Sequence, residues 1–261
     1  MSAMRKSLSN AGHTRPDLRM FEPRTYRNVM KAEDLDYFQV LEFESDLFIG
    51  VDHGSVTPQL TEAVKTELHR LRQNIASYNN DEPDFIPSLT PLTLNPCASP
   101  IVSDMLTAGK RAGVGPMAAV AGAVSKYIGR MLKSYSTEIV VENGGDLFIQ
   151  TKKERRIALH TGNLHFADLG IKIKPRENPL GICTSSGIMG HSLSFGKADA
   201  VTIISSDIPL ADAVATALCN RIKKPADVAH GIAWVKGIPE IAGVLIVIED
   251  QLGAWGEIEL C

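Results

Sequence analysis

The chain has 261 residues, of which 44% are hydrophobic and 22% are charged. This composition is typical of a folded globular protein and excludes a disordered or collagen-like chain. The formal net charge is -3 and aromatic residues make up only 6% of the chain. Neither a uniform basic field nor a base-stacking platform is therefore expected, and we predict no nucleic-acid partner.

The cysteines and the N-terminus indicate the cellular compartment. No two of the four cysteines have C-x-x-C spacing, which gives no support to a zinc knuckle or a redox pair. Residues 1–21 are polar and basic and contain no apolar run of signal-peptide length. No stretch approaches the roughly 20 apolar residues that span a bilayer. We expect a soluble, cytoplasmic protein with reduced thiols and no membrane partner.

Two segments are distinguished by composition. Residues 1–20 are polar and are predicted to form a flexible N-terminal segment. Residues 21–261 are long enough for one large domain or two intimately packed halves with a sizeable core.

The first half of the chain mixes both kinds of secondary structure. Alternating apolar residues predict strands, and apolar residues at helical spacing after a capping residue and a proline predict helices. The predicted elements are a strand hairpin of 37–43 and 46–51, a helix from Thr57 and Pro58 to Tyr78, a loop over 79–96, a helix from Ser99 and Pro100 to Gly113, and a helix of small residues over 117–124.

The second half continues this mixture. The predicted elements are strands at 138–142 and 147–149 around a turn at 143–146, short strands at 156–159 and 169–173, a buried strand at 200–204, a helix over 209–222, a buried strand at 244–248 and a weaker strand at 256–260. Strands and helices do not alternate strictly as βαβ units. The order therefore favours an α+β fold with mixed sheets and packed helices over a doubly wound sheet.

Two small-residue segments resemble each other within the chain. Residues 119–124 align with residues 213–218 at an offset of 94, and each segment follows a proline and precedes an apolar strand. One interpretation is an internal duplication in which the two helices pack together. The other is a chance similarity between alanine-rich helices.

The helix around residue 212 carries the first candidate for chemistry. Asp212 and Thr216 are four residues apart, so both side chains lie on one helical face among Ala, Val and Leu. A carboxylate and a hydroxyl one turn apart supply two oxygen ligands for Mg²⁺. The alternative is structural: Asp212 would be stabilised by the N-terminal N–H groups of its own helix, and Thr216 would bond the carbonyl four residues earlier.

The second candidate is the turn Asn143, Gly144, Gly145 and Asp146 between two strands. Asn-Gly is a strong hairpin signal, so the segment can be a turn and nothing more. In the functional interpretation, the two glycines leave the backbone bare, and a flat or phosphorylated ligand approaches it closely. Asp146 would then be a polar anchor.

The third candidate is the hydroxyl-rich segment over 183–196. It contains Thr184, Ser185, Ser186, Gly187 and His191, together with further serines and glycines. Hydroxyls and bare backbone N–H groups suit phosphate oxygens. Neither a Walker A loop nor a nucleophile elbow is present. The alternative is a polar surface loop.

Taken together and in this order, the three candidates resemble the ApbE-like superfamily, the FAD:protein FMN transferases. That family has a strand ending in a Gly-Gly-Asp/Asn turn, then a Thr-Ser-Gly loop, and an Ala-Asp-Ala-x-Ala-Thr-Ala-Leu helix that binds Mg²⁺. The matching segments are 141–146, 184–187 and 211–218. The last match is the most specific, and the resemblance spans roughly residues 60–222.

The resemblance implies a fold and a chemistry. The fold expected is one ApbE-like α+β domain over 21–261, built of two intertwined halves. The family's metal ligands map to Asp212 and Thr216, which would hold Mg²⁺ beside the pyrophosphate of FAD. The residues at 143–146 and 184–187, with His191, would then contact FAD or FMN while a target threonine of a protein substrate attacks the FMN phosphorus.

Two family motifs are absent from this chain, and they leave other functions open. The helix over 117–124 lacks the family's Lys-Gly-x-x-x-Asp pattern, and the His-x-Ile-Asp-Pro segment after the Thr-Ser-Gly loop is missing. These differences favour a non-catalytic module that binds the same ligand. A third hypothesis is an enzyme for another phosphorylated metabolite, with Arg24, Arg27 and His191 as anion contacts. A homodimer is the default oligomeric state for a soluble chain of this kind.

Overall fold

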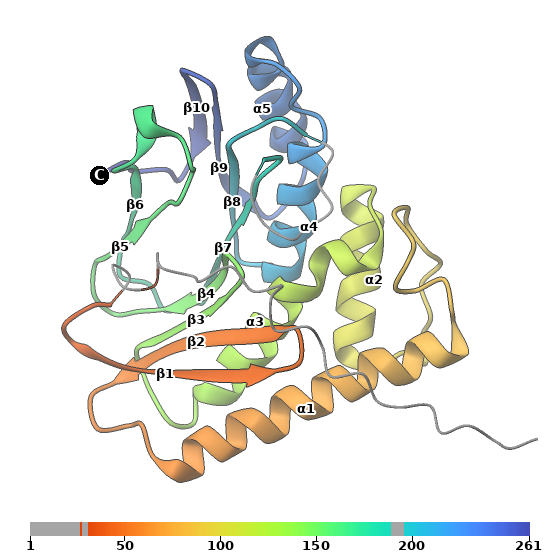
Figure 1. The fold of residues 1–261 in the computed structure, drawn as a ribbon, viewed down its shortest axis with the longest axis vertical. Helices are drawn as coiled ribbons and strands as arrows, with labels where there is room; N and C mark the ends of the chain where they lie inside the picture. The colour runs from red at the N-terminus through yellow and green to blue at the C-terminus, as the bar shows by residue number, and fades with distance from the viewer. Residues whose placement is uncertain (1–26, 28–30, 189–195) are drawn as a thin grey trace, which may run out of the picture.

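A computed structural model of the chain describes residues 27, 31–188 and 196–261. The N-terminal segment predicted at 1–20 lies outside the described residues, as do Arg24 and His191. The described residues form five α-helices, a large sheet and a small two-stranded sheet. The predicted α+β class is confirmed, and Figure 1 shows the arrangement.

The large sheet has eight strands in the order β1-β2-β3-β4-β7-β8-β9-β10. The strands are β1 (Leu35–Glu42), β2 (Ser45–Asp52), β3 (Ile139–Asn143), β4 (Asp146–Gln150), β7 (Leu180–Ser185), β8 (Ala200–Ser205), β9 (Ile241–Ile248) and β10 (Gln251–Gly256). Every neighbouring pair is antiparallel. The pairing is therefore antiparallel rather than mixed as expected, because each strand runs in the opposite direction to its neighbour in the sheet.

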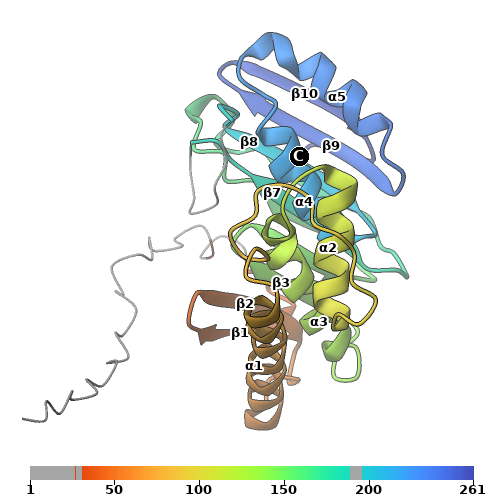
Figure 2. The same cartoon turned by 90° about the vertical axis from the view of Figure 1, so that its right-hand side faces the viewer.

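The helices and the small sheet lie on opposite sides of the large sheet. The helices are α1 (Pro58–Asp81), α2 (Pro100–Ala112), α3 (Val120–Leu132), α4 (Ile208–Cys219) and α5 (Val228–Lys236), and the small sheet is β5 (Arg155–Ala158) with β6 (Gly170–Ile173). Figure 1 shows α1 to α4 gathered on one side, with β5 and β6 on the other, and Figure 2 shows the helix side facing the viewer. No helix in the described ranges combines the length and the apolar character that a membrane crossing requires.

Side-chain alternation along the strands divides the core between these two layers. On β3, Val141 belongs to the cluster under the helices and Val140 to the cluster under the small sheet. On β4, Phe148 belongs to the cluster under the helices and Leu147 to the cluster under the small sheet. Because successive side chains of a strand point to opposite faces, both faces of the central strands are buried.

The two predicted capping signals have different outcomes. Thr57 caps α1, since its hydroxyl accepts the N–H of Leu60 at 3.1 Å, and Pro58 follows at the first helical position. Ser99 precedes Pro100 at the start of α2 but makes no side-chain capping bond. The Ser99 hydroxyl is buried and has no hydrogen-bond partner among the described residues.

Three segments differ from the sequence-based expectation. β7 occupies residues that were expected to be a hydroxyl-rich loop, and α5 was not predicted. The last strand is β10 at Gln251–Gly256 rather than 256–260, although Leu260 forms an isolated bridge with Ile171 of β6. Hydroxyl side chains are compatible with a strand when the backbone is paired on both sides, as that of β7 is by β4 and β8.

The element order repeats along the chain. Two adjacent strands, a set of helices and two further strands occur first as β1 to β4 and again as β7 to β10. The two small-residue helices, α3 and α4, pack against each other, as the duplication hypothesis requires. α3 leads directly into β3, whereas α5 intervenes between α4 and β9. The evolutionary origin of the repeat stays a prediction.

Candidate functional site

The glycine turn joins β3 to β4 at the centre of the large sheet. Asn143 and Asp146 face each other as the last pair of the hairpin. Gly144 and Gly145 between them have φ values of +67° and +100°. Both values lie in the region that favours glycine, so the Gly-Gly sequence dictates this two-residue turn. The predicted turn is therefore present, and it fixes where Asp146 begins β4.

Two hydrogen bonds hold the turn against its neighbours. The side-chain amide of Asn143 donates to the carbonyl of Ala121 on α3 at 3.3 Å. The backbone N–H of Gly145 donates to the Glu142 carboxylate at 2.9 Å. The turn is thus connected to the helix layer on one side and to its own strand on the other.

The hydroxyls of β7 point to opposite faces of the sheet. Ser185 lies on the helix side, where its hydroxyl is 3.2 Å from that of Thr216 on α4. Thr184 lies on the other side and pairs with the Thr202 hydroxyl at 2.9 Å. The strand's period of two therefore separates these neighbours. The hydroxyl of Ser185 therefore contacts an α4 side chain, whereas that of Thr184 faces away from α4.

The remaining members of the predicted hydroxyl segment follow β7. Ser186 accepts the N–H of Ile188 with its hydroxyl at 3.2 Å, and the N–H of Gly187 donates to the Ala198 carbonyl at 2.9 Å. Both residues are half-buried at the end of the strand.

Asp212 is stabilised by a neighbouring helix rather than by its own. One carboxylate oxygen accepts the N–H of Gly122, in the first turn of α3, at 2.8 Å. A Cβ placed on Gly122 would stand 2.8 Å from the Asp212 Cβ and 2.9 Å from the carbonyl of Ile208. Glycine at position 122 permits this close approach, because any Cβ there would collide with α4. The structural alternative placed the Asp212 carboxylate on the N–H groups of its own helix, whereas the bond observed caps α3 across the helix pair.

Thr216 also departs from the structural alternative. Its hydroxyl faces that of Ser185 on β7, as described above. α4 therefore directs both the Asp212 carboxylate and the Thr216 hydroxyl towards the ends of β4 and β7.

Two buried carboxylates meet at this point without a cationic partner. Asp146 is 7% exposed and Asp212 is 8% exposed. Burial raises the pKa of Asp146 well above its usual range, and the negative charge of Asp212 raises it further. Burial also raises the pKa of Asp212, and the N–H groups of Gly122 and Ala121 offset that rise only in part. Within the described ranges, no lysine, arginine or histidine forms an ion pair with either carboxylate.

Cys183 lies between the two carboxylates and the core. It is paired with Asp146 across β4 and β7, and its thiol is 3.7 Å from the Ile208 carbonyl. Burial and the charges of Asp146 and Asp212 raise the pKa of this thiol. A raised pKa keeps the sulfur protonated, so Cys183 is not an activated nucleophile.

The donor set suits a hard divalent cation. Two carboxylates and two hydroxyls, from Asp146, Asp212, Ser185 and Thr216, are oxygen ligands, which Mg²⁺ prefers. The physical observation that fits a cation is the burial of two carboxyl groups that have no ion-pair partner among the described residues, since an unpaired buried carboxylate is costly. No cluster of three or more His, Cys, Asp or Glu side chains suited to a metal occurs in the described part of the chain. Mg²⁺ characteristically uses one or two carboxylates and completes its shell with water and substrate phosphates.

The four candidate ligands are Asp146, Ser185, Asp212 and Thr216. The sequence identified these residues but not the contacts between them. It treated Asp146 as a polar anchor and did not connect its charge with Asp212. The signal was the sequence Gly-Gly-Asp, which places a carboxylate on the strand beside β7. It also did not predict that a backbone N–H group of α3 donates to Asp212. The glycine at position 122 was the sequence signal for that contact.

Two surface hollows lie away from the two carboxylates. One of about 320 Å³ is lined by Thr137, Gln150, Lys152, Pro175, Arg176 and Glu177. The other, of about 270 Å³, is lined by residues 164–169 and Cys261. Their linings contain none of the predicted site residues. The chemical argument for a site therefore rests on the carboxylates and not on a cavity.

Comparison with known proteins places the chain among relatives. A family model described as AbpE bacteria matches residues 27–234. A UPF0280 protein of Methanosarcina barkeri is 36% identical over 199 residues, which cover 76% of this chain and 79% of that protein. A UPF0280 protein of Methanococcus aeolicus is 38% identical over 200 residues, covering 74% of this chain and 81% of that protein.

Solved structures share the fold at low sequence identity. The flavin transferase ApbE from Vibrio cholerae superposes with a TM-score of 0.57 at 14% identity, covering 85% of this chain and 96% of that one. The apo form of the flavinyl transferase ApbE from Pseudomonas stutzeri gives a TM-score of 0.55 at 16% identity, with 85% and 94% covered. These likenesses show that the fold is ApbE-like.

Proposed function

The chain belongs to the family described as AbpE bacteria, and from this premise we propose that it binds a flavin nucleotide together with Mg²⁺. The ligand is FAD or FMN, or a related diphosphate. The observation that carries the proposal is the pair of buried carboxylates, Asp146 and Asp212, which lacks a cationic partner among the described residues. The solved structures of the same fold include proteins described as flavin transferases.

Each residue of the cluster has a distinct task in this proposal. Asp212 and Thr216 ligate the metal from one face of α4, and Asp146 adds a second carboxylate from the start of β4. Ser185 orients the Thr216 hydroxyl through their 3.2 Å contact. The bare backbone of Gly144 and Gly145 allows a ligand to approach the turn closely.

The remaining predicted residues complete the ligand site. Asn143 keeps the turn against α3. We propose that Ser186, Gly187 and His191 line the site for the flavin nucleotide, and that Thr184 supports β7 from the opposite face. The buried Arg27 pairs with two carboxylates and is not available as an anion contact, so the third hypothesis loses one of its three residues.

The reaction that this site would support is transfer of FMN from FAD to a protein threonine. The threonine oxygen would form a bond to the FMN phosphorus, the bond from that phosphorus to the AMP oxygen would break, and the hydroxyl proton would leave to solvent or a base. A bound Mg²⁺ would neutralise the negative charge on the pyrophosphate and on the departing AMP. The chain's own residues would position the pyrophosphate, which is where most of the catalysis of such transfers arises.

Calorimetric titration with FAD, with and without Mg²⁺, tests the proposal. We expect binding that requires Mg²⁺, and its loss in Asp212→Ala. Asp227→Asn is a matched control, because this carboxylate lies on the surface before α5 and bonds only local backbone N–H groups. Wild-type protein that binds FAD equally without Mg²⁺, or an Asp212→Ala variant with unchanged binding, would contradict the metal assignment.

An AMP-release assay separates catalysis from binding. Release of AMP from FAD in the presence of a threonine-containing protein substrate would support the transferase. Metal-dependent binding without AMP release would make the chain a ligand-binding module, the alternative that the two absent family motifs favour. The cytoplasmic location, the homodimer and the division into 1–20 and 21–261 stay predictions.

A further inference from the structure

Arg27 is an arginine buried against the large sheet. Its residue is 7% exposed, and each of its three guanidinium nitrogens has a partner. Nε donates to the Glu142 carboxylate at 2.6 Å, Nη1 to the Asp46 carboxylate at 2.7 Å, and Nη2 to the Asp46 carbonyl at 2.9 Å. Its guanidinium carbon also lies 5.5 Å from the centre of the Phe48 ring. The planar guanidinium thus donates in set directions to both β2 and β3, which holds Arg27 in place.

Glu142 connects this arginine to the glycine turn. The residue is 1% exposed, and its two carboxylate oxygens have different partners. Oε2 accepts from Arg27, while Oε1 accepts the backbone N–H of Gly145 at 2.9 Å. Gly145 holds a φ of +100° and immediately precedes Asp146. A single carboxylate therefore links Arg27 to the backbone that positions Asp146.

Arg27 also balances the negative charge of the buried Glu142 carboxylate. Without Arg27, the buried Glu142 carboxylate would lose the cation that its Oε2 contacts, while its Oε1 still faces the Gly145 N–H. A buried carboxylate that loses its partner must protonate or move, and either change alters the bond to Gly145.

We propose that Arg27 is a positioning residue that acts through Glu142 to hold the glycine turn in shape and thereby sets the affinity of the Asp146 and Asp212 site for Mg²⁺ and its nucleotide. The first part, the link to the turn, stands on the contacts alone. The second part, the effect on affinity, rests on the proposed function. Two separate measurements therefore test them.

Nuclear magnetic resonance of the Gly145 amide tests the link without any ligand. In glycine-labelled protein, we expect Arg27→Met to shift the Gly145 resonance and to speed its hydrogen exchange. The double variant Arg27→Met/Glu142→Gln should return both towards wild type, because the neutral side-chain amide oxygen introduced at position 142 still accepts the N–H and leaves no unpaired charge. Arg72→Met is the matched control, since Arg72 pairs with Glu44 and Ser45 of the neighbouring hairpin and not with Glu142.

The double variant also keeps the experiment informative if the single variant misfolds. If Arg27→Met does not fold, Arg27→Met/Glu142→Gln and Arg27→Lys remain as the informative pair. Arg27→Lys keeps the charge but loses the fork, so we expect an intermediate shift of the Gly145 amide. A Gly145 amide that is unchanged in every folded Arg27 variant would overturn the link.

Mg²⁺-dependent FAD titration tests the effect on affinity. We expect Arg27→Met to weaken binding about 10- to 100-fold, the usual effect of a residue that orients a metal ligand. The double variant should regain most of that loss, whereas a purely structural role would show no such rescue. Equal losses in Arg27→Met and Arg72→Met, or a folded double variant without recovery, would overturn this part.

The two measurements distinguish failure of the inference from failure of the proposed function. Wild-type protein that binds no Mg²⁺ and no FAD would reject the proposed function and, with it, the effect on affinity. The Gly145 amide would then still decide whether Arg27 controls the turn.

Discussion

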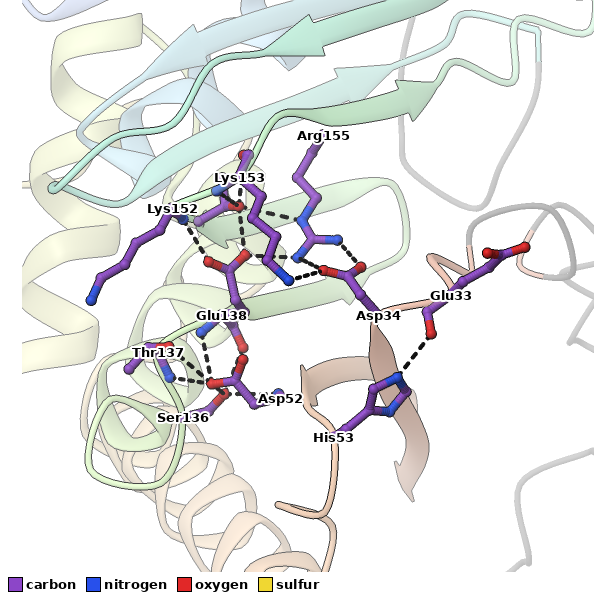
Figure 3. A network of polar contacts seen from close by, with 11 residues as sticks. Glu33, Asp34, Asp52, His53, Ser136, Thr137, Glu138, Lys152, Lys153 and Arg155 are labelled. Carbon is purple, nitrogen blue, oxygen red and sulfur yellow. Dashed lines mark hydrogen bonds and ion pairs between the residues drawn. The ribbon is translucent and has the colours of Figure 1, made fainter.

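Buried carboxylates in two parts of this molecule balance their charge in opposite ways. The first group, which we call the Arg155 network, connects the residues just before β1 and β3 to β5. It consists of Asp34, Glu138, Lys153 and Arg155 (Figure 3), together with Thr151, whose hydroxyl donates to Glu138 at 2.6 Å. Arg155 donates to Glu138 at 2.7 Å and to Asp34 at 3.0 Å. Burial raises the pKa of Glu138, but its bonds to Thr151, Arg155 and the Lys152 N–H outweigh burial and lower it.

The second group consists of Asp146 and Asp212, whose pKa values are raised instead. Their donors are thiol and backbone N–H groups, and none of these carries a full positive charge. The comparison teaches that burial alone does not distinguish a structural acid from a functional one. In the described part of the chain, Glu138 has a cationic partner, whereas Asp146 and Asp212 have none, and the proposed function assigns that place to a bound cation.

Replacement of Arg155 by an uncharged residue should have the largest effect on stability. We expect Arg155→Met to lower the free energy of unfolding by about 3–5 kcal/mol, because it leaves the buried Glu138 unpaired. Lys153→Met is the control, since Lys153 is exposed and pairs with the half-exposed Asp34, and such solvent-exposed pairs contribute little to stability. Urea denaturation of both variants measures the difference, and equal losses would remove the distinction between the two groups.

Neutralisation of the second group should have the opposite effect on the metal-free protein. Asp212→Asn keeps an oxygen for the Gly122 N–H and removes the repulsion of Asp146. We therefore expect unchanged or higher stability, by about 1 kcal/mol. The affinity for Mg²⁺ should fall by at least about 100-fold, beyond the effect of residues that only orient ligands. Thermal unfolding without and with Mg²⁺ measures both, and clear destabilisation of the metal-free variant would show that the pair is structural.

The close contact of α3 and α4 should matter for both stability and binding. Gly122→Ala places a Cβ 2.8 Å from that of Asp212, so the helices must separate. We expect a loss of about 1–3 kcal/mol in unfolding free energy, together with weaker Mg²⁺ binding. Gly237→Ala is the control, because the added atom would have an ordinary contact of 3.4 Å with the Trp234 carbonyl. A Gly122→Ala variant that behaves like Gly237→Ala would refute the close contact.

The pH dependence of stability should show the smallest and most diagnostic difference. The lowered pKa of Glu138 gives stability that is present above about pH 4.5 and is lost as the pH falls through the lowered value. The raised pKa values of Asp146 and Asp212 act with the reverse sign. Their contribution is present below about pH 4 and is lost as the pH rises through the raised values.

Denaturation of the metal-free protein over a pH series checks this sign. Between about pH 5 and 8, wild type should lose stability and Asp212→Asn should lose less, because it removes one of the two raised groups. Saturating Mg²⁺ should flatten the wild-type curve. A wild-type curve that rises over this range and is unchanged in Asp212→Asn would contradict the charge assignment.

Local sequence determined the start of α1, the glycine turn and the shared face of Asp212 and Thr216. Thr57 and Pro58 specify the start of α1 because a cap and a fixed φ act within a few residues. Gly144 and Gly145 specify the two-residue turn because only glycine readily adopts both positive φ values. The spacing of Asp212 and Thr216 likewise places them on one helical face without reference to the rest of the chain.

Only the tertiary structure decided what these residues meet. The faces of Thr184 and Ser185 depended on β7 being a central strand, and hydroxyl composition does not predict pairing. The proximity of Asp146 and Asp212 depended on β4 and α4, which lie far apart in sequence and meet through the sheet order. The charge state of a buried carboxylate is set by such distant neighbours, because electrostatic interactions and desolvation act through space and not along the chain.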